Sequence, residues 1–172
     1  MDSEQAEEDA VDRIIGQWSR ETPELRLDAM EIFGRVHRVS RLTLQRLEPV
    51  YLAYGIGRAE FDVIASIRRS GEPYTLSPKQ IAATLMLSSG GLTGRLDKLE
   101  RNGLVERLPD PNDRRGLRVR LTDAGREAVG KAVAAGLDVQ HEVLDTLTPT
   151  EQETLAGLLR KLHKGFHDEP IA

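Results

Sequence analysis

The stretch that decides the fold runs from Leu85 to Leu121 and has the sequence LMLSSGGLTGRLDKLERNGLVERLPDPNDRRGLRVRL. Its first half is polar, with leucines at helical spacing. Ser88 or Ser89 can cap a helix there, because a serine oxygen accepts a hydrogen bond from a backbone N–H of the first turn. We expect this helix to continue to Asn102, with Gly103 as its C-terminal stop.

The second half of the stretch alternates apolar and charged residues. This alternation predicts two half-buried strands, LVERL over residues 104–108 and LRVRLT over residues 117–122. The residues between them favour turns: Pro109, Asp110, Pro111, Asn112, Asp113 and Gly116. We therefore expect a β-hairpin directly after the helix.

A second short helix precedes this one. Ser77 is a good N-cap, Pro78 suits the first helical position, and Gln80 can complete a capping box. This helix is expected to stop near Leu87. Two short helices joined by a tight polar turn are typical of a helix-turn-helix, and the following hairpin predicts its winged form. Such a fold indicates duplex DNA as a partner.

The remainder of the chain is predicted to be helical, so the fold class is mainly α with a small β-hairpin wing. Apolar periodicity and capping signals predict further helices over residues 8–19, 27–53, 59–70, 123–145 and 149–166. The long terminal helices have more apolar surface than a small core can cover, which favours a homodimer. We expect four segments: an acidic extension with an extra helix (1–26), a long dimerisation helix (27–56), the winged lobe (57–122) and C-terminal dimerisation helices (123–172).

Composition limits the class of protein. The formal net charge is −4, but residues 1–31 hold ten acidic and three basic side chains, whereas residues 90–120 hold eight basic and five acidic ones. Local charge governs attraction to phosphate, because screening acts over about 8–10 Å. The absence of cysteine excludes disulfides and zinc ribbons. No apolar run approaches the ~20 residues that span a bilayer, and the acidic N-terminus is unlike a secretory leader, so we expect a cytoplasmic protein with no membrane partner.

Several residues are candidates for DNA contact because they lie on the exposed sides of these elements. On the two short helices they are Ser77, Ser88, Ser89, Gly90, Gly91, Thr93, Gly94 and Lys98, and on the wing they are Asp113, Arg114 and Arg115. Small residues at a helix N-terminus allow close approach of the backbone to bases and phosphates. Leu92, Leu96 and Leu99 are expected to anchor the opposite face in the core. The alternative is an ordinary amphipathic helix with a glycine-weakened start.

An enzyme is the competing class. His163 and His167 have the i, i+4 spacing of a metal pair, but the sequence offers no third ligand at convincing spacing. The Ser-Ser-Gly-Gly run lacks the lysine of a P-loop, and no nucleophile–base arrangement is present. We therefore expect no catalysis, no metal and no cofactor. A winged helix used only for protein contacts remains a further alternative.

From about Leu27 to Leu162 the chain resembles the MarR family of regulators. The most specific part is Leu99–Arg126, where the family wing pattern D-x-R-x-x-x-x-x-L-T falls on Asp113, Arg115, Leu121 and Thr122. The resemblance implies that Arg115 enters the minor groove and that Asp113 positions it. It also implies a homodimer that binds a pseudo-palindromic operator, commonly as a repressor.

A finer resemblance is to the urate-responsive branch of that family, which has an extra N-terminal helix. Four positions are similar to that branch's response set: Trp18, Asp62, Arg95 and Arg107. The resemblance implies that Trp18 and Arg95 hold an anionic purine, that the anion displaces Asp62, and that Arg107 faces the same site and transmits the shift. The alternatives are a dimer-core Trp18, an Asp62–Arg95 ion pair, an exposed Arg107, or a phenolic or other aromatic acid as the signal.

Overall fold

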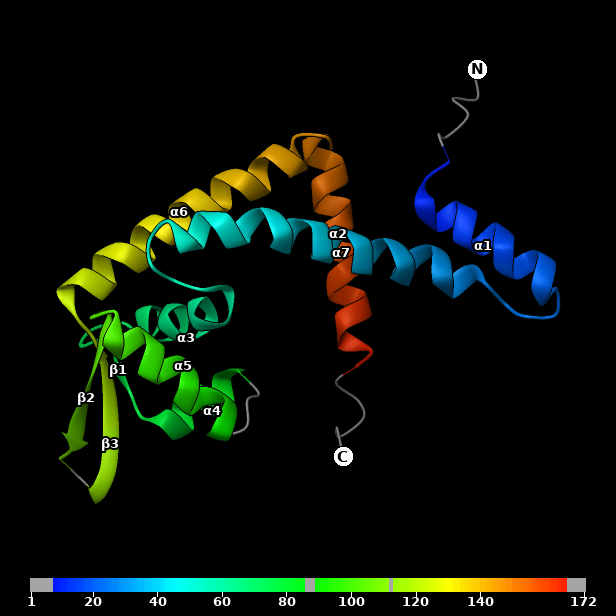
Figure 1. The fold of residues 1–172 in the computed structure, drawn as a ribbon. Coiled ribbons are helices and arrows are strands. Elements are labelled where there is room, and N and C mark those ends of the chain that lie inside the picture. Colours follow the sequence, from blue (N-terminus) through cyan, green and yellow to red (C-terminus); the bar gives the residue numbers. More distant parts are fainter. Residues whose placement is uncertain (1–7, 86–88, 112, 167–172) are drawn as a thin grey trace. The chain divides into compact units, whose positions relative to one another are not determined.

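The computed structural model describes residues 8–85, 89–111 and 113–166, without the side chains of residues 89, 90, 114 and 115. In chain order (Figure 1), the elements are α1 (Ala10–Glu21), α2 (Asp28–Leu52), α3 (Arg58–Arg69), β1 (Thr75–Leu76), α4 (Pro78–Leu85), α5 (Ser89–Arg101), β2 (Val105–Asp110), β3 (Asp113–Leu121), α6 (Asp123–Leu144) and α7 (Pro149–Lys164). The predicted mainly helical fold with a small wing is confirmed. The chain divides between Arg46 and Leu47, within α2, into two compact units.

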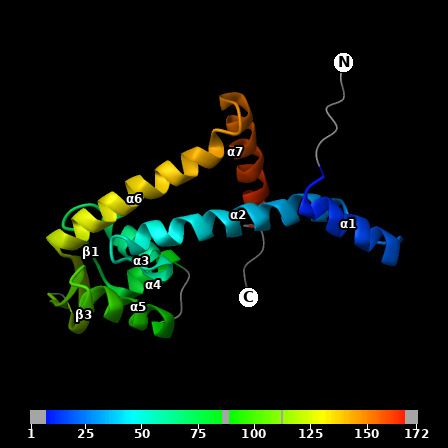
Figure 2. The same ribbon diagram turned by 45° about the horizontal axis from the view of Figure 1, so that its top comes forward.

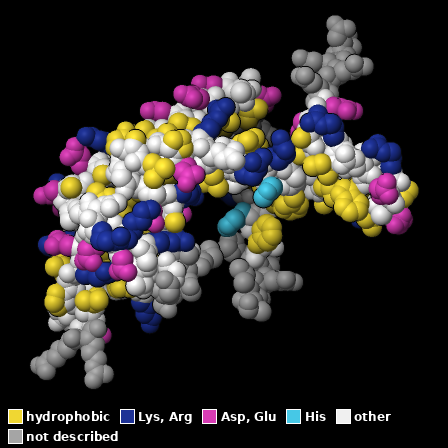
Figure 3. All heavy atoms as spheres, viewed as in Figure 1, with side chains coloured by type: hydrophobic (Ala, Val, Ile, Leu, Met, Phe, Trp, Pro, Cys, Tyr) yellow, Lys and Arg dark blue, Asp and Glu magenta, His cyan; other side chains and the backbone are white. Residues whose placement is uncertain are grey.

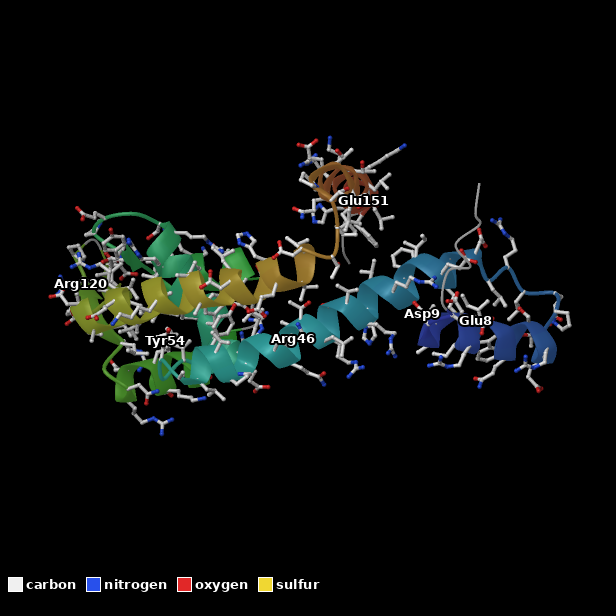
Figure 4. The ribbon with its side chains drawn as sticks, turned by 90° about the horizontal axis from the view of Figure 1, so that it is seen from above. Glu8, Asp9, Arg46, Tyr54, Arg120 and Glu151 are labelled. Atoms are coloured by element: carbon white, nitrogen blue, oxygen red, sulfur yellow. The ribbon has the colours of Figure 1, made fainter. Side chains whose placement is uncertain are left out.

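In the N-terminal unit, α1 is held against α2 by the ion pairs of Arg35 and by the packing of Val11 against Gly34. Arg35 Nε lies 3.0 Å from Asp9 Oδ2, and Arg35 Nη2 lies 2.7 Å from Asp12 Oδ1 (Figure 4 labels Asp9 at the start of α1). The hydrogen bond from Arg35 holds the pKa of Asp12 below its ordinary value. Val11 is buried against Gly34, where a Cβ atom would lie 2.9 Å from Val11 Cγ1. The small residue therefore permits the contact between the two helices.

In the second unit, a three-stranded antiparallel sheet has the order β1-β3-β2. Val119 of the central strand β3 pairs with Arg107 of β2 on one side and with Leu76 of β1 on the other. The predicted hairpin is confirmed, but β1 was not predicted, because two residues are too few to produce a periodic signal. β3 also begins at Asp113 instead of Leu117, because Asp113 pairs with Asp110 of β2 beyond a register shift between Pro109 and Asp110.

The core of this unit is built around α3, which contacts α4, α5, α6 and β3 (Figure 2). Its largest fully buried side chains are aliphatic: Ile56, Val63, Ile64, Ile67, Ile81, Leu99, Val105, Val119 and Val129. On α5, Leu92, Leu96 and Leu99 are at most 3% exposed. The prediction that these leucines anchor α5 is therefore confirmed, and the opposite side of the helix is left exposed.

The helix ends follow the capping signals of the sequence. Gln80 N donates to Ser77 Oγ, while Gln80 Oε1 accepts from the backbone N–H of Ser77, which confirms the predicted capping box of α4. Thr148 and Glu151 form the same reciprocal arrangement at the start of α7. Gly103, just past α5, has a φ of 69°, a conformation that favours glycine. These local rules explain why the helix limits could be predicted closely.

Gly125 provides a test of the packing between α6 and the turn that follows α5. A Cβ atom at Gly125 would lie 1.8 Å from the carbonyl oxygen of Leu104, whereas one at Gly130 would meet no described atom within 4 Å. Because backbone cannot yield easily, Gly125→Ala should lower the free energy of unfolding by about 2 kcal/mol or more. The matched Gly130→Ala should raise it by about 0.5–1 kcal/mol. Urea unfolding at one protein concentration measures both, and equal midpoints would contradict this account.

Candidate nucleic-acid interface

The predicted contact residues of α5 lie on its exposed side. Gly91, Thr93, Gly94 and Lys98 are exposed, opposite the buried leucines. Ser89 is the first residue of α5 and Gly90 the second, whereas Ser88 lies outside the described residues. The exposed side of α5 therefore presents small and polar groups to solvent, with no large apolar side chain among its described residues.

Ser77 is half-buried, and its hydroxyl forms the hydrogen bonds that cap α4. Its hydroxyl donates to Gln80 Oε1 over 3.0 Å and accepts from the Gln80 backbone N–H over 3.3 Å. A hydroxyl has a second lone pair. The capping bonds thus leave Ser77 one acceptor site toward a partner at the N-terminus of α4.

At the wing, glycine allows two aspartates to approach each other. A Cβ atom at Gly116 would lie 2.9 Å from the Cβ of Asp110 and 3.0 Å from the Cβ of Asp113. Asp110 is nearly buried, and its carboxylate accepts from Arg118 Nε over 2.7 Å. The sequence predicts Asp110 only as a turn former, so its ion pair with Arg118 is a finding of the structure. The backbone of Arg114 and Arg115 belongs to β3, and their side chains lie outside what the structure describes.

Arg107 joins α5 to the wing. Its guanidinium pairs with Asp97 and with Glu100, the latter over 2.6 Å, and its backbone N–H donates to Glu100 Oε1. Both acids belong to α5. The expectation that Arg107 faces Asp62 must therefore be corrected: its two ion pairs are with α5, because residues 97 and 100 lie on the side of that helix nearest β2.

Two further members of the expected response set, Arg95 and Asp62, have their contacts in the first two turns of α3. Arg95 Nη1 donates to the carbonyl oxygen of Ala59 over 3.2 Å. Asp62, one turn later, pairs with Arg58 over 2.9 Å, so the alternative of an Asp62–Arg95 ion pair is replaced by Arg58. Arg58 Nε is buried and has no hydrogen-bond partner among the described residues. The guanidinium groups of Arg58 and Arg95 therefore both have contacts in the first two turns of α3, where the Asp62 carboxylate lies.

Trp18, the fourth member, belongs to the N-terminal unit. It lies on α1 and its side chain is 46% exposed. Thr22 Oγ1 and the Thr22 backbone N–H both donate to the Trp18 carbonyl oxygen, which fixes the end of that helix. The indole is therefore held on an ordered helix with nearly half of its surface available for a contact.

A separate hollow of about 440 Å³ lies in the second unit, between the end of α2, α3 and α6. Its lining combines two aromatic rings with polar groups: Tyr51, Phe61, Arg68, Arg69 and Gln140. The rings of Tyr51 and Phe61 are stacked with centroids 3.9 Å apart, and burial raises the pKa of Tyr51. Apolar walls with guanidinium groups at the edge suit a small aromatic anion.

Charges on the winged lobe are mixed. Basic and acidic side chains are interspersed over the face that Figure 3 shows. No group of three histidine, aspartate or glutamate residues in the described part of the chain could hold a metal ion. Within the same residues, no helix is both long and apolar enough to cross a membrane.

Known proteins are similar to this chain over most of its length. A family model described as "MarR family" matches residues 54–116. The HTH-type transcriptional regulator PecS of Dickeya dadantii is 36% identical over 90% of this chain and 93% of its own length. The multiple antibiotic resistance protein MarR of Escherichia coli K12 is 36% identical over 75% of this chain and 89% of its own.

A solved structure of the E. coli relative has a fold similar to that of this chain. A mutant of E. coli MarR complexed with operator DNA has a TM-score of 0.69 and 32% identity, and the match covers 81% of this chain and 98% of that one. PecS is a transcriptional regulator by name, which agrees with the prediction of a regulator. The winged lobe, the position of α5 and the extent of the matches lead to one conclusion: this chain belongs to the MarR family of winged helix-turn-helix transcriptional regulators.

Proposed function

We propose that this protein is a homodimeric repressor that binds a pseudo-palindromic operator, and that a small anionic ligand such as urate releases it from the DNA. The observation that carries the proposal is α5, which exposes its small and polar residues while Arg95 on the same helix contacts the α3 turn near Asp62. One rigid element then serves both DNA recognition and ligand binding. The operator complex of the E. coli relative supports the DNA part of this proposal.

Dimerisation is supported by apolar surface on the terminal helices. On α1 and α2 the exposed large apolar side chains are Ile14, Trp18, Ile32, Phe33, Val36, Val39, Leu42, Leu44 and Leu52. α7 has no buried residue, and its exposed apolar residues are Leu155, Leu158, Leu159 and Leu162. Surfaces of this kind mark protein interfaces, and a second copy of the chain is the partner that family membership supports.

The ligand mechanism follows from the contacts at the start of α3. An anion that binds Arg95 competes with the Ala59 carbonyl for the guanidinium. Beside that anion, the Asp62 carboxylate is electrostatically unfavourable. The ligand then has different affinities for the two arrangements of α3 and α5, which is the condition for coupling to DNA. Arg107 passes a movement of α5 to the wing through its two ion pairs.

A second candidate signal is an aromatic acid bound in the hollow beside Tyr51. The stacked rings and the two arginines Arg68 and Arg69 favour a flat carboxylate there. This site involves neither Arg95 nor Trp18. A ligand that acts through it would therefore be insensitive to substitutions in the urate set, so the two signals can be separated by mutagenesis.

Urate should release the protein from DNA. The substrate for the assay is a labelled duplex that spans the intergenic region upstream of the protein's own gene. Saturating urate should weaken binding by about tenfold, a typical allosteric coupling, and Trp18→Ala or Arg95→Ala should reduce that response. Arg101→Ala is the control, because Arg101 is exposed on α5 and, among the described residues, hydrogen-bonds to the Asp97 carbonyl in its own helix. No response at millimolar urate would refute the urate assignment; release by salicylate that Arg95→Ala does not alter would favour the aromatic acid.

The wing arginine should contribute to affinity through the phosphate backbone and the minor groove. Arg115→Ala should weaken DNA binding by about tenfold and reduce the salt dependence of log K by about one. Arg26→Ala removes an exposed arginine in the loop before α2 and should change neither quantity. Fluorescence anisotropy across a range of salt concentrations measures both. If the wild type bound DNA without a steep salt dependence, a protein-interaction module would be the better interpretation.

Gly94 should separate DNA affinity from stability. An added Cβ at Gly94 would meet no described atom within 4 Å, so Gly94→Ala should stabilise the fold by about 0.5–1 kcal/mol. If the α5 backbone approaches the DNA closely at this position, the same methyl group should weaken operator binding by about fivefold or more. Gly130→Ala should give a similar stabilisation with unchanged affinity. Unchanged DNA affinity in Gly94→Ala would exclude close approach at Gly94.

A further inference from the structure

Glu60 is one of two buried polar residues in the described part of the chain, and its carboxylate is held by α5. The side chain of Glu60 is 9% exposed, and its Oε2 atom lies 2.9 Å from Nζ of Lys98, which is 46% exposed. At Gly57 an added Cβ would lie 2.0 Å from that oxygen and 2.9 Å from that nitrogen. The N-cap of α3 is therefore a glycine whose missing side chain leaves space for this ion pair.

Arg95 of α5 and Asn102, the residue that follows α5, bind the same segment. Arg95 donates to the carbonyl oxygen of Ala59, and Asn102 Nδ2 donates to the carbonyl oxygen of Gly55 over 3.0 Å. Positions 95, 98 and 102 lie on one face of a helix, because residues three, four and seven apart are neighbours. Residues 55–60 thus receive three polar contacts from the second half of α5 and the residue that follows it. Of the three, only the Lys98 contact is an ion pair, and its acidic partner is buried.

We propose that Glu60 is a positioning residue for DNA recognition: through Lys98 it fixes the rotation of α5 and so determines how well the protein distinguishes its operator from other DNA. This inference rests on the proposed role of α5 in DNA recognition. A buried carboxylate is strongly restrained, because burial has removed its hydration and the charge would be left uncompensated if its partner moved away. The ammonium group it holds is therefore confined to one place, and α5 with it. Lys98 then contributes to recognition through Glu60 rather than mainly as a phosphate contact.

The change in DNA affinity caused by Glu60→Gln distinguishes a simple charge effect of Glu60 from a positioning role, because the two predict changes of opposite sign. Glu60 is negatively charged, so Glu60→Gln should strengthen binding to phosphate if only charge matters. The same change would also free Lys98 to bind phosphate. If Glu60 positions α5, Glu60→Gln instead weakens binding to the operator. A charge effect and a positioning effect thus have opposite directions in one conservative variant.

The experiment uses the full chain and two duplexes at the same salt concentration, the upstream intergenic DNA and an unrelated sequence of equal length. Glu60→Gln and Lys98→Met should each lower affinity for the first duplex by about tenfold, the loss expected of a charge-assisted hydrogen bond, and should change affinity for the second by no more than about twofold. The double variant should be no weaker than either single variant, because the two residues act as one unit. Lys98→Arg, which keeps the charge, should retain most of the selectivity.

The exposed Glu127–Lys131 pair of α6, whose atoms lie 2.7 Å apart, gives matched controls. Glu127→Gln and Lys131→Met should leave selectivity unchanged. If Glu60→Gln does not fold, Lys98→Met gives the same test, because its apolar stem is retained. Stronger or unchanged operator binding in Glu60→Gln, or an equal loss on both duplexes in Lys98→Met, overturns the positioning role and leaves the proposed function standing. Failure of the wild type to prefer the upstream duplex overturns both.

Discussion

The anchoring of α5 is the constraint on which the rest of the structure depends. Leucines at positions 92, 96 and 99 bury one face of the helix in the aliphatic core. Polar groups then hold it from two sides: Arg95, Lys98 and Asn102 contact residues 55–60, while Asp97 and Glu100 pair with Arg107 on β2. Apolar burial sets how deeply the helix lies, because it is non-directional. The hydrogen-bonded ion pairs set its rotation, because they depend on geometry.

In the proposed mechanism, this arrangement lets DNA recognition and ligand response share one element. The contacts of Arg95 and Lys98 both end on the first turn of α3, which also holds Arg58, and the partner of Arg58, Asp62, lies one turn later. A ligand that takes one of these arginines alters the restraints on α5 directly, without a long path through the core. The wing follows α5 because Arg107 is bound to two of its acids. Coupling of this kind needs only two alternative sets of contacts with a small free-energy difference.

Local sequence signals predicted most of the fold. Capping boxes at Ser77 and Thr148 and the glycine after α5 defined helix ends, because these signals act within a few residues. The buried side of α5 followed from leucine spacing. The prediction was wrong where distant residues decide: β1 exists only because β3 lies beside it, and β3 begins earlier than its apolar alternation, since Gly116 lets Asp110 and Asp113 approach each other.

The sequence by itself determined the winged fold, the family and the candidate DNA-contact and ligand residues, because periodicity, caps and the wing motif are contained in short segments. Only the tertiary structure decided the partners of the charged residues. Lys98 was expected at the DNA and is paired with Glu60; Arg107 was expected beside Asp62 and is bound to Asp97 and Glu100. The physical reason is that an ion pair depends on which side chains the packed helices and strands bring within about 4 Å, and residues as far apart as 60 and 98 meet only after α5 has packed against α3.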